Sequence, residues 1–464
     1  MTGPARARLE DPPADRSPAA RAARGKAARH AVPREAHARF EPAAGRPDPV
    51  GLLEEQARTR VPELLPIRYG RMLASPLAYL RGAALAMAGD LSGTPSTGYI
   101  VQACGDAHLG NFGIFASPER RLVFDINDFD ETLPAPWEWD VKRLAASLEV
   151  AGRVSGYSPK QRRILVREAA GQYRLEMRRL AGLGDLDVWY SRGELDELQD
   201  RFQVILTTRE RELAGTDLAA VSEVHSLPAI TTISSGRPRI KAAPPLVVPI
   251  PPDDELRTRL TDIVAGYRES LESDRRYLVS RFELTDVARK VSGIGSVGLR
   301  CWIALLAGRD RLDQLFLQLK EAQPSVLSQF AGVSEFAAHG ERVVAGQRLM
   351  QAASDTFLGW HQSAPEAGGD YYVRQLRDWK FSIATAQLAP EAMRSYGALC
   401  GSTLARAHAR SGDRIAIGAY LGGSGVFEAA VAEFAAIYAE QNERDYALFR
   451  TAVRSGRLPA STEE

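Results

Sequence analysis

Apolar residues recur at helical spacing in the first and last parts of the chain. We expect helix through most of 52–91, because apolar side chains such as Leu77, Leu80 and Ala84 stand three or four positions apart there. The same spacing predicts a long helix near the C-terminus, around 427–438. Both ends of the chain are therefore expected to contribute mainly helices.

Shorter apolar runs predict strands between these helical regions. Runs at 112–115 and 122–126 flank a Ser-Pro-Glu-Arg turn, which favours a β-hairpin. A short strand through 99–102 precedes this hairpin. Four later runs predict a second, strand-rich region, and they cover 287–291, 299–306, 315–320 and 371–376.

These patterns predict an α+β protein with two lobes. The first residues are rich in Ala, Arg and Pro, so we expect them to be disordered, with a targeting or anion-binding role as the alternative. The predicted divisions are a disordered tail over 1–45, a helical lobe over 46–225, a proline-rich connecting segment over 226–255, a β-rich nucleotide-binding lobe over 256–385, helices that complete the helical lobe over 386–455, and a disordered tail over 456–464.

Composition excludes several classes of protein. The chain has 464 residues and a net charge of +1, so its overall charge does not favour binding to nucleic acid or to an anionic membrane. No apolar run approaches the ~20 residues that span a bilayer. The 3 cysteines are widely separated, which favours a reducing compartment. We therefore expect a cytoplasmic protein, and its oligomeric state stays open.

Carboxylates and amides gather between Cys104 and Asp130. Asp106 precedes Asn111 by five residues, so one loop can aim the carboxylate at an acceptor hydroxyl and the amide at a metal ion. Asp128 returns on the adjacent strand, with Asp130 beside it. Carboxylates this close repel unless a cation lies between them, and oxygen ligands favour Mg²⁺ or Mn²⁺. We predict a metal site at Asn111, Asp128 and Asp130, and a catalytic role for Asp106.

His108 stands in the same loop and is placed with Asp106 among the catalytic-loop residues. A hydrogen bond that braces the loop is its expected role, with metal ligation as the alternative. A purely structural role of the whole motif is also open, because Gly-Asp and Asn-Phe-Gly sequences form turns and Asp128 could simply end a strand.

The sequence Gly-Ile-Gly-Ser-Val-Gly lies between two predicted strands. Glycine lets backbone N–H groups close on phosphate oxygens, so we predict nucleotide contacts at Gly293, Gly295, Ser296 and Gly298. The alternative is a plain glycine-rich hairpin. A later strand ends in Lys320, which is the place of a phosphate-binding lysine in kinases.

Such a lysine needs a carboxylate partner on the next helix. We expect Glu341 to pair with Lys320, and Glu335 is the second choice. The strand predicted over 371–376 would then lead to the adenine-binding segment.

The catalytic segment resembles that of aminoglycoside phosphotransferases and other protein-kinase-like enzymes. Their pattern is His-Gly-Asp-x-His-x-x-Asn, then Ile-Asp-Phe, then an Asp that opens a helix. Here Cys104 replaces the first His. The resemblance implies a two-lobe fold, ATP and Mg²⁺. The matching residues are Asp106, His108, Asn111, Asp128 and Asp140, the last of which would brace the loop.

The order of segments differs from that of an ordinary kinase. There the glycine loop and lysine precede the catalytic loop, whereas Gly293 follows Asp106 by 187 residues. We therefore expect a circularly permuted kinase-like fold, which is tolerated where chain ends lie close together. The sequence at 404–408 resembles the helix that leads into the loop in phosphotransferases.

Over about 46–455 the chain also resembles an uncharacterised bacterial family, domain-of-unknown-function family 2252. That resemblance brings no established activity. The segments that carry it are 66–72, 105–109, 124–130, 137–140, 347–350 and 371–375.

The expected function is an ATP- and Mg-dependent phosphotransferase that acts on a hydroxyl of a small molecule or protein. The alternatives are nucleotidyl (AMP) transfer on the same fold, a metallophosphatase, and a non-catalytic nucleotide-binding protein. The sequence does not identify the acceptor. Arg68, Arg71 and Arg81 are candidates for binding an anionic acceptor, with surface or ion-paired roles as the alternative.

Overall fold

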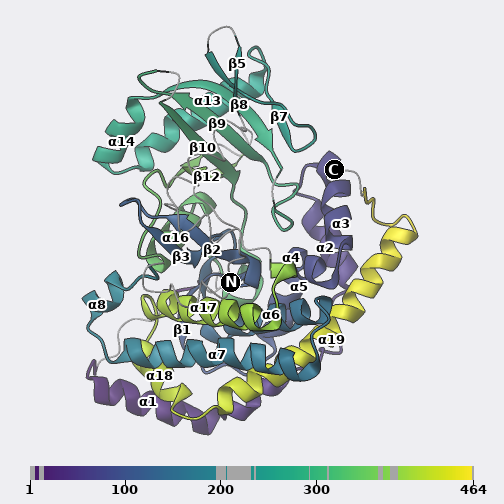
Figure 1. Ribbon diagram of the computed structural model, residues 1–464, viewed down its shortest axis with the longest axis vertical. Coiled ribbons are helices and arrows are strands. Elements are labelled where there is room, and N and C mark those ends of the chain that lie inside the picture. The colour runs from purple at the N-terminus through teal and green to yellow at the C-terminus, as the bar shows by residue number, and fades with distance from the viewer. Residues whose placement is uncertain are drawn as a thin grey trace, which may run out of the picture.

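The protein combines a helical part with a six-stranded sheet, which confirms the predicted α+β class. In Figure 1 the sheet lies above the helices, with α13 (Glu255–Tyr267) and α14 (Ser273–Ser280) beside it. The computed structural model describes residues 6–9, 15–194, 205, 231–234, 237–291, 293–310, 313–363, 369–376 and 385–461.

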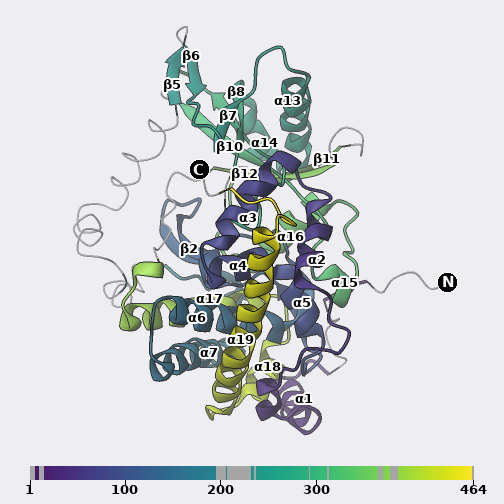
Figure 2. The same cartoon turned by 90° about the vertical axis from the view of Figure 1, so that its right-hand side faces the viewer.

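Helix α6 (Trp137–Val154) forms the centre of the helical part. Every residue from Trp137 to Gly152 is buried, as expected of a helix surrounded by neighbours on all sides. Helices α7 (Pro159–Ala181) and α17 (Pro390–Ala409) pack against it, and the long α19 (Val426–Arg454) runs along the bundle (Figure 2). The predicted C-terminal helix is therefore confirmed.

The segment predicted as mostly helical over 52–91 forms several short helices. Pro62, Pro66 and Pro76 each lie in the first turn of a new helix, where proline lacks only an N–H that would be unbonded anyway. The remaining helices of the described residues are α1 (Pro18–Ala31), η1 (Arg34–Ala38), α2 (Pro49–Ala57), η2 (Pro62–Leu64), α3 (Leu65–Leu73), α4 (Pro76–Gly82), α5 (Ala84–Ser92), η3 (Leu109–Asn111), α8 (Asp185–Tyr190), η5 (Arg268–Ser270), α15 (Ser328–Ala331), α16 (His339–Met350), η7 (Thr385–Gln387) and α18 (Arg414–Leu421).

The large sheet is antiparallel, with strand order β11-β12-β10-β9-β8-β7. Lys320 on β10 stands opposite Cys301 on β9 and Tyr372 on β12, so these three side chains share one face. The predicted strands of this region are confirmed, and two edge strands were not foreseen. The strands are β7 (Val247–Pro249), β8 (Glu283–Lys290), β9 (Cys301–Ala307), β10 (Gln314–Glu321), β11 (Gly359–Gln362) and β12 (Asp370–Gln375).

Three small ladders complete the strands. The predicted hairpin is confirmed, and its Phe124 and Ile126 face the core while Asp125 takes the other face. The ladders pair β1 (Ile100–Ala103) with β4 (Leu133–Pro136), β2 (Phe112–Ala116) with β3 (Leu122–Ile126), and β5 (Thr231–Ser234) with β6 (Arg237–Ile240).

The prediction of a disordered tail over 1–45 is wrong for the described residues 15–45. Helix α1 packs on α18, where Arg21 and Arg24 form ion pairs with Asp413. Arg29 donates to the carbonyl of Tyr420 at the end of α18. Helix α1 contains no acidic residue, and it is ordered because its arginines contact the carboxylate of Asp413 and the negative C-terminal end of α18.

The predicted boundaries of the C-terminal tail and of the connecting segment also differ from those in the structure. Leu458 is buried, and the backbone N–H of Ser461 donates to Pro66, so residues 456–461 are not the predicted disordered tail, and 462–464 lie outside the described residues. Part of the predicted connecting segment joins the sheet as β7, whereas 226–230 lie outside the described residues.

No single helix of the described residues is long and apolar enough to cross a membrane. The one pair of helices that passes this test together, by length and composition, is α18 with α19, which meet at a bend of 86°.

We expect Gly25→Ala to destabilise the protein. A Cβ at Gly25 would lie 2.0 Å from the carbonyl oxygen of Ala416, so α1 and α18 would have to separate. Overpacking of this kind costs about 1–3 kcal/mol, which exceeds the gain of about 1 kcal/mol for alanine over glycine in a helix. Thermal unfolding measures the change. Gly45→Ala is the control, because no atom lies within 4 Å of a Cβ there. Equal stability of the two variants would contradict the packing of α1.

Candidate functional site

The loop after β1 is held by a buried carboxylate. Asp140, in the first turn of α6, accepts backbone N–H groups from Cys104 at 2.6 Å and Gly105 at 3.0 Å. Gly105 has φ of +83°, and a Cβ there would lie 2.2 Å from the carbonyl oxygen of Glu131, so only glycine fits. The predicted bracing role of Asp140 is confirmed.

Asp140 also joins the loop to the C-terminal helices. His408 Nε2 lies 3.1 Å from Asp140 Oδ2, and His408 Nδ1 lies 2.9 Å from the hydroxyl of Tyr173. His408 ends the 404–408 sequence on α17. The helix that resembles the one preceding the catalytic loop in phosphotransferases therefore lies next to this loop, although it comes some 300 residues later.

Asp106 is fixed by an arginine that the sequence analysis missed. Arg143 donates through Nε at 2.9 Å and Nη2 at 2.6 Å to Asp106 Oδ1. The Asn111 amide nitrogen donates at 2.7 Å to the backbone oxygen of Asp106, which leaves the amide oxygen of Asn111 for another ligand. Arg143 stands three residues after Asp140, and this i, i+3 spacing on one helix face was a usable signal.

His108 braces the loop, as expected. Its Nδ1 accepts the backbone N–H of Gly110 at 3.0 Å, and its Nε2 lies 3.7 Å from Asp106 Oδ2. Burial lowers the pKa of His108 to about 4, against the opposing effect of Asp106. The imidazole is therefore neutral near pH 7 and does not neutralise the carboxylate.

Side chains of the large sheet hold the segment 126–132 in place. Lys320 forms ion pairs with Asp130 Oδ2 and, at 3.5 Å, with Asp128 Oδ2. The Tyr372 hydroxyl donates to Asp130 Oδ1 at 2.7 Å. Burial alone would lower the pKa of Lys320, but Asp128 and Asp130 outweigh it and raise that pKa, so the ammonium stays charged.

Two arginines hold the backbone of the same segment. Arg342 on α16 donates to the carbonyls of Asp130 and Thr132, and Arg374 on β12 donates to that of Asn127. The prediction that Glu341 pairs with Lys320 is wrong, because the carboxylates of 126–132 take that place. The residue that α16 directs at this segment is Arg342.

The glycine loop between β8 and β9 lies over the same site. Gly293, Gly295 and Ser296 line a cavity together with Asp106, Asn111, Asp128 and Asp130, whereas Gly298 does not line it. Arg71 donates to the carbonyl of Gly293 at 2.8 Å, and the backbone N–H of Val61 donates to that of Gly298 at 2.8 Å. The helices that follow α2 therefore hold the loop down.

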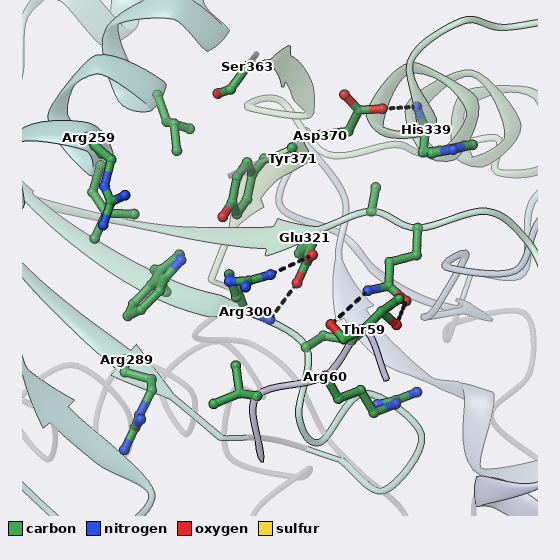
Figure 3. Close-up of a pocket in the computed structure, with 18 of the residues that line it drawn as sticks. Thr59, Arg60, Arg259, Arg289, Arg300, Glu321, His339, Ser363, Asp370 and Tyr371 are labelled. Carbon is green, nitrogen blue, oxygen red and sulfur yellow. Dashed lines mark hydrogen bonds and ion pairs between the residues drawn. The ribbon is translucent and has the colours of Figure 1, made fainter. Parts of the chain in front are cut away.

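The cavity has a volume of about 80 Å³. Sites for drug-sized ligands usually measure ~300–1,000 Å³, so this one accepts an ion or a few water molecules in its present form. A second cavity of about 1340 Å³ lies beyond Arg60 and Leu299, which line both. Figure 3 shows Arg259, Arg289 and Arg300 around this larger cavity, where Arg300 is paired with Glu321.

A divalent ion at this site would depend on the donors that line the cavity. Among the described residues, no group of three or more His, Cys, Asp or Glu is arranged to hold a metal alone. Mg²⁺ commonly takes one or two carboxylates together with substrate phosphates. Asn111 and Asp128 fit that role. Both oxygens of Asp130 are engaged by Tyr372 and Lys320, so we leave Asp130 out of the candidate metal site.

Comparison with known proteins places the chain in a family. The family described as "Uncharacterized protein conserved in bacteria (DUF2252)" matches residues 60–452, and the chain belongs to it. The match covers the loop after β1, the hairpin, the glycine loop and Lys320. No curated protein and no solved structure matches the chain. The family description names no activity, so the function has to be argued from the site.

We expect Glu131→Gln to flatten the pH dependence of stability. Burial raises the pKa of Glu131 from 4.5 to about 7, against the opposing N–H of Val326. The folded protein therefore holds a proton that the unfolded chain has lost between about pH 4.5 and 7, so this contribution is full at low pH and is lost as pH rises through 7. Melting temperatures from pH 5 to pH 8 measure it. Exposed Glu55→Gln is the control, and parallel curves for wild type and Glu131→Gln would contradict the raised pKa.

Proposed function

We propose that this protein is an ATP- and Mg-dependent phosphotransferase with a kinase-like active site. One observation carries the proposal: residues distant in sequence line one cavity. Asp106 and Asn111 come from the loop after β1, Asp128 from the hairpin, and Gly293 to Ser296 from the glycine loop. These are the residue types that phosphoryl transfer uses to orient a hydroxyl, hold a metal and cover phosphates.

The order of elements in the sheet supports the proposal. The strands adjoin as β8-β9-β10-β12-β11, with the glycine loop between β8 and β9, Lys320 on β10, and α16 after it. Protein kinases also carry a glycine-rich loop, then a strand lysine, then a helix. The helical part comes from chain segments on both sides of this sheet, which agrees with circular permutation of such a fold.

In this proposal Asp106 receives the proton of the acceptor hydroxyl. Arg143 engages Oδ1, so Oδ2 is the oxygen available to the hydroxyl. The acceptor oxygen bonds to the γ-phosphorus, the bond from that phosphorus to the bridging oxygen breaks, and ADP leaves with the electron pair. Asn111 and Asp128 would hold Mg²⁺, which offsets phosphate charge when bound. Positioning supplies most of the rate in such reactions.

Lys320 departs from the kinase pattern in its partner. A kinase pairs this lysine with a glutamate of the following helix, whereas Lys320 binds Asp128 and Asp130. In the proposed reaction the lysine exchanges Asp128 for phosphate oxygens and keeps Asp130. The small cavity must also widen to admit a triphosphate, and the glycine loop is the part that has to move. Two hydrogen bonds to its backbone carbonyls hold it in the present position, one from the Arg71 side chain and one from the backbone N–H of Val61.

We expect ATP to raise the melting temperature only when Mg²⁺ is present. Ligand at 100 times its Kd stabilises a protein by about 2.7 kcal/mol, and Asp128→Asn should abolish most of this gain by removing the metal ligand. Asp125→Asn is the control, because Asp125 lies three residues earlier, on β3, and does not line the cavity. Thermal shift with ATP, ADP and GTP tests this, and absence of stabilisation by any nucleotide would refute the proposal.

We expect Asp106→Asn to lower turnover by about 100- to 10,000-fold while MgATP still binds, since it removes the proton acceptor and not the metal ligands. Mass spectrometry of the product after incubation with candidate acceptors measures the reaction. An added mass of one phosphoryl group supports the proposal, whereas an added AMP would assign nucleotidyl transfer instead. Full activity of the variant would remove Asp106 from the chemistry.

A further inference from the structure

Three arginines from one short stretch of chain line the small cavity. Arg60 follows α2, Arg68 lies on α3 and Arg81 on α4. They lie beside Asp106, the proposed proton acceptor, and none of the three has a role in the proposed transfer so far.

Arg68 is a buried cation without a carboxylate partner. Its side chain belongs to a residue that is 1% exposed, and only Nη2 is bonded, to the carbonyl of Gly82 at 2.9 Å. Nε and Nη1 have no hydrogen-bond partner. The nearby charge that acts on Arg68 is that of Arg60, which repels it. A buried charge is tolerated when an opposite charge accompanies it, so this arrangement is completed by an anion.

Arg60 and Arg81 also carry a buried N–H group without a hydrogen-bond partner among the described residues. Arg60 donates to the carbonyl of Val297 at 2.5 Å, and its Nε has no partner. Nε of Arg81 is also buried without a partner. Three guanidinium groups therefore surround the cavity without a hydrogen-bonded carboxylate among the described residues.

The carboxylates of the cavity are already engaged elsewhere. Asp106 is bonded to Arg143, and Asp128 and Asp130 share Lys320. Glu131 accepts the N–H of Val326. Glu131 attracts Arg60 and Asp106 attracts Arg81, but among the described residues no carboxylate is hydrogen-bonded to any of the three arginines.

Arg81 lies near the proposed proton acceptor. The strongest attraction on Arg81 comes from Asp106, and Gly295 of the glycine loop lies close to the backbone oxygen of Arg81. Lys320 and Asp128, which would meet the nucleotide, come from the sheet and the hairpin. Guanidinium groups bind phosphate through paired N–H donors, and a cavity of about 80 Å³ suits a group of that size.

Building on the phosphotransferase function above, we propose that Arg60, Arg68 and Arg81 bind a phosphate group of the acceptor, which is therefore a phosphorylated hydroxyl compound. Arg60 and Leu299 also line the larger cavity, which is wide enough for the rest of such a molecule. The acceptor phosphate then lies beside Asp106, and its hydroxyl reaches the carboxylate.

The probe is inorganic phosphate, added to the full chain in EDTA without nucleotide, with chloride at matched ionic strength as the reference. We expect phosphate to raise the melting temperature of wild type and of Asp128→Asn equally, and calorimetry to give one site. Arg68→Met and Arg81→Gln should each weaken phosphate binding at least tenfold. Arg58→Gln is the control, because Arg58 is exposed and lines the larger cavity but not the small one, where free phosphate is expected to bind.

Arg68→Met carries a second readout. Without phosphate it should unfold at the wild-type temperature or above, because methionine removes a buried unpaired charge, whereas an arginine with a purely structural role would leave a less stable variant. If that variant does not fold, Arg81→Gln decides the question through its phosphate affinity.

The remaining outcomes separate this inference from the proposed function. Phosphate binding that survives in Asp128→Asn while MgATP fails to stabilise wild type supports the anion site and refutes the phosphotransferase. Phosphate that binds only with Mg²⁺ and Asp128, or that competes with a non-hydrolysable ATP analogue, belongs to the nucleotide and overturns the acceptor assignment. No binding to wild type, or equal loss in Arg58→Gln, also overturns it.

Discussion

The ion pairs of Lys320 with Asp128 and Asp130 determine how the two parts of this protein meet. Lys320 belongs to the sheet, and both carboxylates belong to the hairpin segment of the helical part. The Lys320 side chain is 3% exposed, whereas those of Asp128 and Asp130 are 34% and 20% exposed, so removal of both carboxylates would leave a buried charge without its partners. Arg342 and Arg374 add hydrogen bonds to backbone carbonyls of the same segment. The site lies where it does because charge compensation closes the molecule there.

A second buried carboxylate, that of Asp140, organises the loop after β1. Asp140 satisfies two loop N–H groups and contacts His408, and so it unites a helix from the first half of the chain with one from the last quarter. Arg143, one turn further along α6, then orients Asp106. A single helix with buried polar residues at i and i+3 thus positions both the backbone of this loop and the side chain of Asp106. This explains why α6 carries charged residues although it is buried on every side.

Features set by neighbouring residues could be predicted from the sequence, whereas those set by distant ones could not. The hairpin follows from alternating apolar residues, and the role of Asp140 follows from the motif. The partner of Lys320 depends on how two separate segments pack, and spacing along the chain says nothing of that. Helix α1 was missed for the same reason, because its arginine-rich composition is compensated by Asp413 and the end of α18, almost 400 residues later.

Closure of the cavity and its positive charge have a common origin. Arg60 and Arg71 hold the glycine loop through its backbone carbonyls, and Arg60 and Arg68, which line the cavity, carry buried N–H groups without a hydrogen-bond partner among the described residues. An anion bound at Nε of Arg60 would share this guanidinium with the carbonyl of Val297, which Nη1 binds. If the acceptor phosphate binds at these arginines as proposed, the arginine site and the glycine loop are therefore linked through the side chain of Arg60.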